Sequence, residues 1–181
     1  MKTYISILRG INVGGQNAIK MEALREMYCR LGFSDVQSYI QSGNVIFRTE
    51  ETDTKSLGKS ISAEILKTFD CEISVLVLER DEWRNALKNN IFLNDSSKNP
   101  DFIHLTFLSD LPNKNFIEKI SDIIYFPDEY CIVNKVVYLY CPSGYGNTKL
   151  SNSFFERKLK LCATTRNLKT SNELLKLADS I

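Results

Sequence analysis

The chain has 181 residues, of which 43% are hydrophobic and 25% are charged. This composition is typical of a globular protein and excludes a disordered chain, which holds far fewer apolar residues. Only 8 glycines and 4 prolines are present, which excludes a collagen-like protein. The formal net charge is +1, so the chain as a whole has no electrostatic attraction to nucleic acid or to an acidic membrane.

The N-terminal apolar run, Tyr4–Leu8, is interrupted by Arg9 and is too short for a signal peptide or a membrane span. The number of cysteines is odd, none has C-x-x-C spacing, and their neighbours are apolar, which argues against a disulfide framework or a zinc site. We therefore expect buried free thiols in a cytoplasmic protein with no membrane partner. The cysteines are Cys29, Cys71, Cys131, Cys141 and Cys162.

The first 90 residues alternate between strand and helix patterns. Short runs rich in β-branched and aromatic residues predict strands over 4–9, 36–40, 45–47 and 73–78. Apolar residues at helical spacing predict helices over 19–31, from 52 or 53 to 69, and from 81 onwards. Residues 41–44 predict a hairpin loop. The expected order is β-α-β-β-α-β, followed by a helix.

A polar segment, 91–101, then predicts a linker, because it is rich in asparagine, aspartate and serine. Strands are expected over 102–108, 130–133, 136–140 and 162–166, and a helix over 113–121. Ser153 with Glu156, and Thr170 with Glu173, have the spacing of capping boxes that open two further helices. The second part therefore has the same order of elements as the first.

The order β-α-β-β-α-β is that of the ferredoxin-like arrangement. We therefore predict an α+β fold with two ferredoxin-like halves, 1–90 and 102–181, joined by the linker 91–101, each half being followed by an extra helix. No repeat is visible at the level of individual residues. The alternative is one larger α+β domain built around a single sheet.

A glycine-rich loop between the first strand and the first helix is the first candidate site. Glycines let the backbone approach a ligand closely, and consecutive amides at a helix N-terminus attract anions. The spacing G-x-x-x-G-G matches neither a dinucleotide fingerprint nor a Walker loop, so a tight structural connection is the alternative. The candidate ligand-binding residues are Arg9, Gly10, Asn12, Gly14, Gly15 and Lys20.

Basic residues near the C-terminus form the second candidate. In the loop 143–150, two residues separate Gly146 from Lys149, which excludes a Walker loop. Arg157 belongs to a basic helix, where the alternative is a solvated face. Arg166 lies in a short polar segment and suits bidentate binding of phosphate or carboxylate. Lys149, Arg157 and Arg166 are therefore further candidate ligand-binding residues.

Catalytic and metal-binding patterns are absent from the sequence. The single histidine, His104, lies within an expected strand between apolar neighbours, where a structural role is the more common one. No H-E-x-x-H motif and no cluster of carboxylates is found, so no metal site is predicted. The sequence identifies neither a catalytic residue nor a cofactor.

The charge is distributed unevenly along the chain. Residues 1–48 carry a net +3 and residues 141–181 a net +4, whereas residues 49–140 carry −6. We hypothesise that the two basic ends face each other across a cleft between the halves, which binds a phosphorylated or other anionic ligand, a nucleotide or nucleic acid. The alternatives are an enzyme that uses the same groups as transition-state clamps, and a protein-interaction subunit without a small-molecule ligand.

Three blocks of the sequence carry a resemblance to a known family. They are Leu8-Arg9-Gly10-Ile11-Asn12-Val13-Gly14-Gly15 with Tyr4 before them, then 39–45 (YIQSGNV), and 156–159 (ERKL) with 163–167 (ATTRN). With these blocks the chain resembles the family called domain of unknown function 1697, over essentially its whole length. The resemblance implies a bacterial, cytosolic protein with ferredoxin-like parts, and it supplies no activity.

Overall fold

The computed structural model describes residues 1–15 and 17–181. The chain divides into two compact units. The first unit contains residues 1–85 together with the C-terminal residues 173–181, and the second contains residues 86–172. The expected division into 1–90, 91–101 and 102–181 stays a prediction, while the compact units assign the chain's last nine residues to the first unit.

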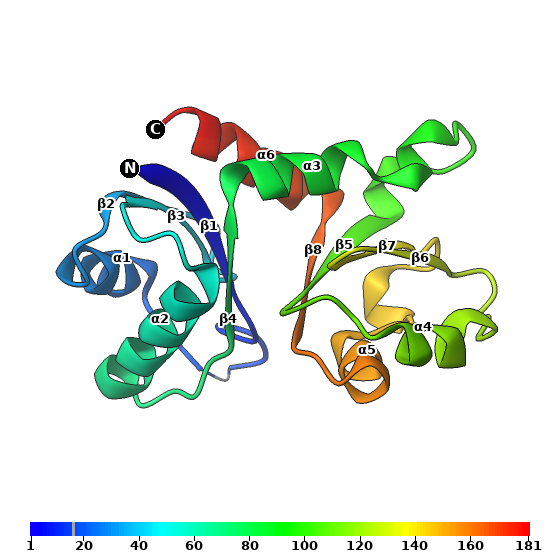
Figure 1. Ribbon diagram of the computed structural model, residues 1–181, viewed down its shortest axis with the longest axis horizontal. Helices are drawn as coiled ribbons and strands as arrows, with labels where there is room; N and C mark the ends of the chain where they lie inside the picture. The colour runs from blue at the N-terminus through cyan, green and yellow to red at the C-terminus, as the bar shows by residue number, and fades with distance from the viewer. Residues whose placement is uncertain (16) are drawn as a thin grey trace. The chain divides into compact units, whose positions relative to one another are not determined.

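The first unit is built on a four-stranded antiparallel sheet with the order β2-β3-β1-β4. Its strands are β1 (Lys2–Leu8), β2 (Ser34–Tyr39), β3 (Asn44–Thr49) and β4 (Val75–Glu79). Helices α1 (Met21–Arg30) and α2 (Thr54–Phe69) lie together on one face of this sheet (Figure 1). Helix α3 (Arg80–Lys88) follows β4 directly.

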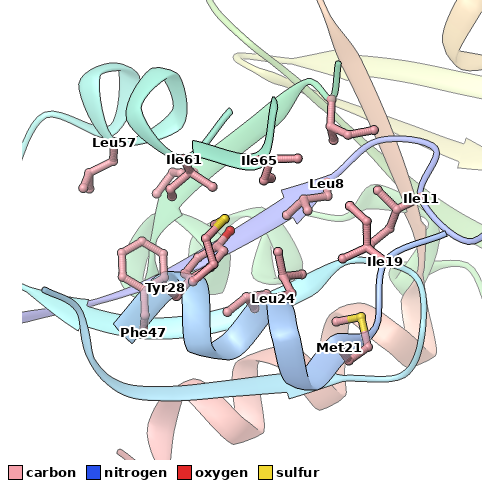
Figure 2. Packing of buried hydrophobic residues seen from close by; sticks show 14 of the residues in the cluster. Leu8, Ile11, Ile19, Met21, Leu24, Tyr28, Phe47, Leu57, Ile61 and Ile65 are labelled. Carbon is pink, nitrogen blue, oxygen red and sulfur yellow. The ribbon is translucent and has the colours of Figure 1, made fainter. Parts of the chain in front are cut away.

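The core of the first unit lies between this sheet face and the two helices. Strands β1 and β3 place Tyr4 opposite Phe47, and both side chains are fully buried. Tyr28 from α1 contacts the Phe47 ring edge-on, with ring centroids 5.5 Å apart. Figure 2 shows the rings of Tyr28 and Phe47 beside the aliphatic side chains that α1 and α2 direct toward the sheet. The apolar stripes that predicted both helices are thus the faces that pack on the sheet.

The second unit repeats this architecture with different residues. Its antiparallel sheet has the order β6-β7-β5-β8, formed by β5 (Ile103–Leu108), β6 (Glu129–Val133), β7 (Val136–Tyr140) and β8 (Ala163–Asn167). Helices α4 (Lys114–Ser121) and α5 (Asn152–Leu159) contribute to one core cluster with the sheet. Helix α6 (Leu168–Asp179) follows β8.

Both sheets therefore have the strand order of a ferredoxin-like unit, with the first strand of each unit at its centre beside the third and fourth. The protein has an α+β fold with two similar ferredoxin-like halves, and α3 and α6 are the extra helices that follow them. The prediction is confirmed, and the alternative of a single sheet is excluded because no strand of one unit pairs with a strand of the other among the residues described.

Both predicted capping boxes are wrong, whereas the cap of α2 is confirmed. Asp53 accepts a hydrogen bond from the Lys55 amide at the start of α2, at 3.0 Å. Helix α5 instead begins two residues before the expected position, because Ser151 accepts the bond from the Phe154 amide. The carboxylate of Glu156, expected to close that box, accepts a bond from the amide of Ala163, at 3.1 Å.

Helix α6 also begins earlier than expected. Thr170 lies inside the helix, and its amide donates to the side-chain oxygen of Asn167, at 2.7 Å. Asn167 is the last residue of β8. Strand β8 therefore leads directly into α6. The side chain of Asn167, and not that of Thr170 as the sequence predicted, bonds to an amide in the first turn of the helix.

The segment 91–101 is packed against the second sheet. It contains the short 3-10 helices η1 (Ile91–Asn94) and η2 (Pro100–Phe102). The ammonium of Lys98 forms an ion pair with Glu129 of β6. It also lies 4.5 Å from the centroid of the Tyr140 ring and 5.7 Å from that of Phe92. These contacts attach the segment to β6 and β7.

All five cysteines are free. The expectation that they are buried is wrong for Cys29 and Cys162, which are exposed, and holds for Cys141. Burial raises the pKa of the Cys141 thiol to about 11. Within residues 1–15 and 17–181, no helix is long and apolar enough to cross a membrane.

Candidate functional site

The loop after β1 has a backbone conformation that its glycines make possible. Gly10, Gly14 and Gly15 have φ angles of +71°, +59° and +78°, in the region that other L-residues rarely adopt. A Cβ atom added at any of the three would meet no atom within 4 Å. These glycines are therefore required by the conformation of the backbone rather than by lack of space, and the surface beside them is open.

The side chain of Asn12 fixes the shape of this loop. Its amide nitrogen donates to the carbonyl oxygens of Ile19, at 2.9 Å, and Gln41, at 2.8 Å. Its oxygen accepts a bond from the Ile19 amide, at 2.8 Å. Asn17 adds a bond to the carbonyl of Gly10, at 3.1 Å. The side-chain amide of the predicted ligand residue Asn12 thus bonds to the backbone at Ile19 and Gln41.

Gly43 connects this loop with the hairpin between β2 and β3. Its carbonyl accepts a bond from the Leu8 amide, at 2.8 Å. A Cβ atom at Gly43 would lie 2.7 Å from the Cβ of Leu8 and 2.8 Å from the Cδ1 of Ile11. Figure 2 shows Leu8 and Ile11 on the core side of the loop. The first two family-like blocks, 8–15 and 39–45, therefore pack against each other.

Two basic residues flank the loop. Arg9 is half-buried at the end of β1, and its amide bonds to the carbonyl of Ser74, at 3.0 Å. Lys20 is exposed and occupies the N-cap position of α1, where its side chain makes no capping bond. The first turn of α1 also contains the acidic Glu22. The loop therefore leads into an α-helix N-terminus whose N-cap side chain leaves the first-turn amides uncapped.

The three predicted residues of the second unit lie in different surroundings. Lys149 is exposed, with its ammonium 5.5 Å from the centroid of the Tyr125 ring. Arg157 is exposed on α5 and donates to the carbonyl of Ser153, at 3.3 Å. Arg166 is the partly buried member of the set. Burial thus distinguishes Arg166 from the two exposed cations, Lys149 and Arg157. That all three face the Arg9–Lys20 loop across a cleft stays a prediction.

Arg166 lies on β8, at the edge of the sheet. Its guanidinium donates to the carbonyl of Thr165, at 2.9 Å. Burial lowers the pKa of Arg166 to about 10, an effect that Tyr145 opposes. The guanidinium remains charged at neutral pH, at a position where an anion would be less screened by water than at an exposed residue.

A cluster of hydroxyl groups beside Arg166 was missed by the sequence analysis. The Thr165 hydroxyl lies 2.6 Å from that of Thr106 and 2.6 Å from the Asn152 oxygen, to which it donates. It accepts a bond from the Tyr145 hydroxyl, at 3.0 Å. One side chain thus joins β5, β8, α5 and the 3-10 helix η3 (Tyr145–Asn147). The four residues are spread over 60 positions, so no local motif could have indicated the cluster.

His104 lies next to this cluster. Its ring stacks on the Tyr145 ring, with centroids 4.9 Å apart. Its Nδ1 lies 3.1 Å from the carbonyl oxygen of Phe102, and because a carbonyl only accepts, Nδ1 carries the proton in the neutral ring. Burial lowers the pKa of His104. The sequence indicated a structural role for His104. The ring stack on Tyr145 and the hydrogen bond to the Phe102 carbonyl are contacts of that kind.

His104 predicts a pH dependence of stability. Because its pKa is lower in the folded than in the unfolded protein, the unfolded chain binds the proton more readily. The free energy of unfolding should be constant above the ordinary pKa of 6.5 and should fall as the pH drops below it. Urea unfolding at a series of pH values measures this. A His104→Phe variant keeps the ring stack and should show a flatter profile; an unchanged profile would contradict the assignment.

Comparisons with known proteins agree with this architecture. A family model described as "Protein of unknown function (DUF1697)" matches residues 1–138, which include the glycine loop and the hairpin at Gly43. The third family-like block, 156–167, lies outside the matched residues. No curated protein matches the chain.

A solved structure shares the complete fold. The chain is similar to the conserved bacterial protein SP0830 from Streptococcus pneumoniae, with a TM-score of 0.72 and 21% sequence identity, over 98% of each chain. At this identity the likeness shows the fold alone. The family match covers most of the chain and contains the loop whose packing is described above, and the chain belongs to the DUF1697 family of proteins of unknown function.

Proposed function

We propose that this protein binds a phosphorylated or other anionic ligand, such as a nucleotide or a nucleic acid phosphate, at the Arg9–Lys20 loop. The observation that carries the proposal is the loop itself. Three glycines with positive φ angles leave its outer surface open, and Asn12 holds its shape from within. The loop residues that these bonds fix before binding lose little conformational entropy when a ligand arrives.

The electrostatics of the loop favour an anion over a cation or a neutral ligand. Backbone amides in a turn with left-handed residues form concave anion sites. The N-terminus of a helix carries a partial positive charge, which the loop reaches at Lys20. Arg9 and Lys20 add two full charges at the two ends of the loop. Phosphate oxygens are suited to such a combination of amides, a guanidinium and an ammonium.

Arg166 supports an anion contact in the second unit as well. A guanidinium that is partly buried gains more from a nearby negative charge than one in water. The hydroxyl groups of Tyr145 and Thr165, which lie close by, are already bonded within their own cluster. We therefore assign the charge contact of this unit to Arg166, ahead of the exposed Lys149 and Arg157.

Thermal-shift titration with inorganic phosphate, a mononucleotide and a short single-stranded oligonucleotide tests the proposal. Binding of any of these to the folded protein raises the melting temperature, by an amount that grows with the logarithm of the ligand concentration once this exceeds the Kd. Lys20→Ala should weaken the affinity by about tenfold, because a charge-assisted hydrogen bond contributes about 1.4 kcal/mol or more. Binding should also weaken as salt is added.

The matched control is Lys59→Ala, which also removes an exposed lysine, on α2 and outside the loop. Its affinity should equal that of the unchanged protein. Arg166→Ala is paired in the same way with Lys158→Ala, an exposed position on α5. Equal losses in Lys20→Ala and Lys59→Ala, or the absence of stabilisation by all three probes, would overturn the proposal.

A further inference from the structure

Strand β6 forms an open edge of the second sheet. Among the strands of the described chain it pairs only with β7, at the end of the order β6-β7-β5-β8. Its pairing with β7 is regular from Glu129 to Val133. An edge strand of this kind presents a row of backbone donors and acceptors to any chain that can align with it.

The corresponding edge of the first unit is protected, whereas β6 is not. In β2 the register shifts between Ser34 and Gln37, and Asp35 has a positive φ angle and an ion pair with Arg48 at 3.2 Å. Irregularity and charge of this kind discourage edge-to-edge pairing. Strand β6, with the sequence EYCIV, keeps a regular register, and its one charged residue, Glu129, lies at its first position, where it pairs with Lys98.

The hairpin geometry determines which groups face the open side of β6. A two-residue turn, Asn134-Lys135, joins Val133 to Val136, which places these two residues in a hydrogen-bonded pair. Every second residue back along β6 therefore bonds to β7. The backbone groups of the residues between them, Tyr130 and Ile132, point to the open edge.

An apolar groove runs beside this edge. It has a volume of about 400 Å³ and is lined by residues that include Ile117 and Ile120 of α4 and Tyr130 of β6. Ile124 also lines it and is 80% exposed, and Phe126, just before β6, is 92% exposed. These are the two most exposed large hydrophobic side chains of the described residues. Exposed apolar surface beside an unpaired strand is typical of an interaction site.

We propose that β6 pairs with β6 of a second copy of this chain, antiparallel and centred on Cys131, in a two-fold symmetric dimer with one continuous eight-stranded sheet. In this register, Tyr130 of each copy lies opposite Ile132 of the other, so the outward backbone groups bond reciprocally. This inference is independent of the proposed anion site, since it rests on the opposite features of the surface: apolar side chains and free backbone groups.

Charge complementarity argues for a second copy as the occupant. The residue before β6 is the acidic Asp128, and the turn after β6 contains the basic Lys135. Antiparallel pairing about Cys131 places the acidic end of one copy beside the basic turn of the other, twice, by symmetry. A strand with these charges at its ends is complementary to itself, which an isologous interface requires.

The same register brings the two Cys131 residues face to face. Tyr130 and Ile132 pack toward the helix-side core, so the Cys131 side chain lies on the other face of the sheet. Paired across the two-fold axis in a non-hydrogen-bonded position, the two Cα atoms would be about 4.5 Å apart. This separation is within the range that a disulfide spans.

Diamide oxidation tests the register. It takes two electrons and two protons from a pair of thiols, and leaves one disulfide. In a Cys29→Ser/Cys162→Ser background, which lacks the exposed thiols, we expect a covalent dimer linked through Cys131. Adding Cys131→Ser should abolish it. The absence of a covalent dimer, or a covalent dimer that persists after Cys131→Ser, would overturn the proposal.

Light scattering across a range of concentrations tests the association itself. The unchanged protein should be a dimer at high concentration. Cys131→Lys places two like charges directly opposite each other and should give a monomer. The matched variant Cys162→Lys, at an exposed position outside β6, should remain a dimer. A monomeric unchanged protein, or an equal effect of the two lysines, would overturn the proposal and favour an extended peptide of another protein as the strand's partner.

Discussion

Gly43→Ala should destabilise the first unit by about 3 kcal/mol, the largest effect expected from a single added methyl group in this protein. Two costs combine. The φ angle of Gly43 is +71°, which costs an L-residue about 1–2 kcal/mol. The new Cβ would also lie 2.7 Å from the Cβ of Leu8 and 2.8 Å from a methyl carbon of Ile11. Leu8 and Ile11 are both buried and have little room to move.

Urea unfolding followed by the fluorescence of Trp83, the single tryptophan, measures this change in the first unit. Gly14→Ala is the matched control, because its φ angle is +59° and its Cβ would meet nothing within 4 Å. It should cost about 1–2 kcal/mol, which is the conformational part alone. Equal losses in the two variants would show that the close approach of Gly43 to Leu8 and Ile11 contributes nothing.

Thr165→Val should destabilise the protein by about 2–3 kcal/mol, since it removes a hydroxyl that three other groups share. The hydroxyls of Thr106 and Tyr145 and the amide oxygen of Asn152 would each lose a hydrogen-bond partner in a partly buried place. The change in volume is small, so the loss reports the hydrogen bonds rather than a cavity.

Thr164→Val makes the same chemical change at the neighbouring position, but it should stabilise the protein. Its hydroxyl is buried and has no hydrogen-bond partner among the described residues. Replacing a desolvated, unbonded hydroxyl with a methyl group should stabilise the protein by about 1 kcal/mol. Chemical denaturation of both variants, followed by circular dichroism, compares them. Losses of the same size at both positions would contradict the role of the Thr165 cluster.

A local sequence motif describes the glycine loop with Gly43, and the hydroxyl cluster of Thr165, only in part. The glycines of the loop were visible as candidates, but Gly43 lies in the next hairpin, and its contact with Leu8 and Ile11 exists only after β1 and β3 pair. The proposed anion-binding loop packs its inner side on the hairpin at Gly43, so a change in either segment should affect the other. This is why stability and phosphate affinity are to be measured together in the Gly43→Ala protein.

The order of strands and helices, and with it the ferredoxin-like character of both halves, was predictable from the sequence. Apolar residues recur at the two periods that separate strands from helices, and these periods are properties of the local chain. The cap at Asp53 was predictable for the same reason, because an N-cap bond spans only two or three residues. Two equal sets of elements in the same order leave few ways to form sheets.

The tertiary structure alone decided the details of the site. Ser151 rather than Ser153 caps α5, because Glu156 is used instead to bond the amide of Ala163 at the start of β8. Asn12, a candidate for ligand contact, is occupied by the backbone at Ile19 and Gln41. Which hydrogen-bond partner such a side chain takes depends on the groups that the fold places beside it. Because those groups are distant in the sequence, a local pattern does not predict the choice.

The burial of single residues was decided in the same way. The sequence assigned Arg157 to a basic helix and Arg166 to a short polar segment, but it did not indicate that Arg166 is partly buried on an edge strand while Arg157 is exposed. The hydroxyl cluster of Thr165 draws its members from four elements, which the sheet order brings together. Sequence periodicity determined which elements form, because that choice is local; the pairing of those elements determined the site, because its contacts join residues far apart in the chain.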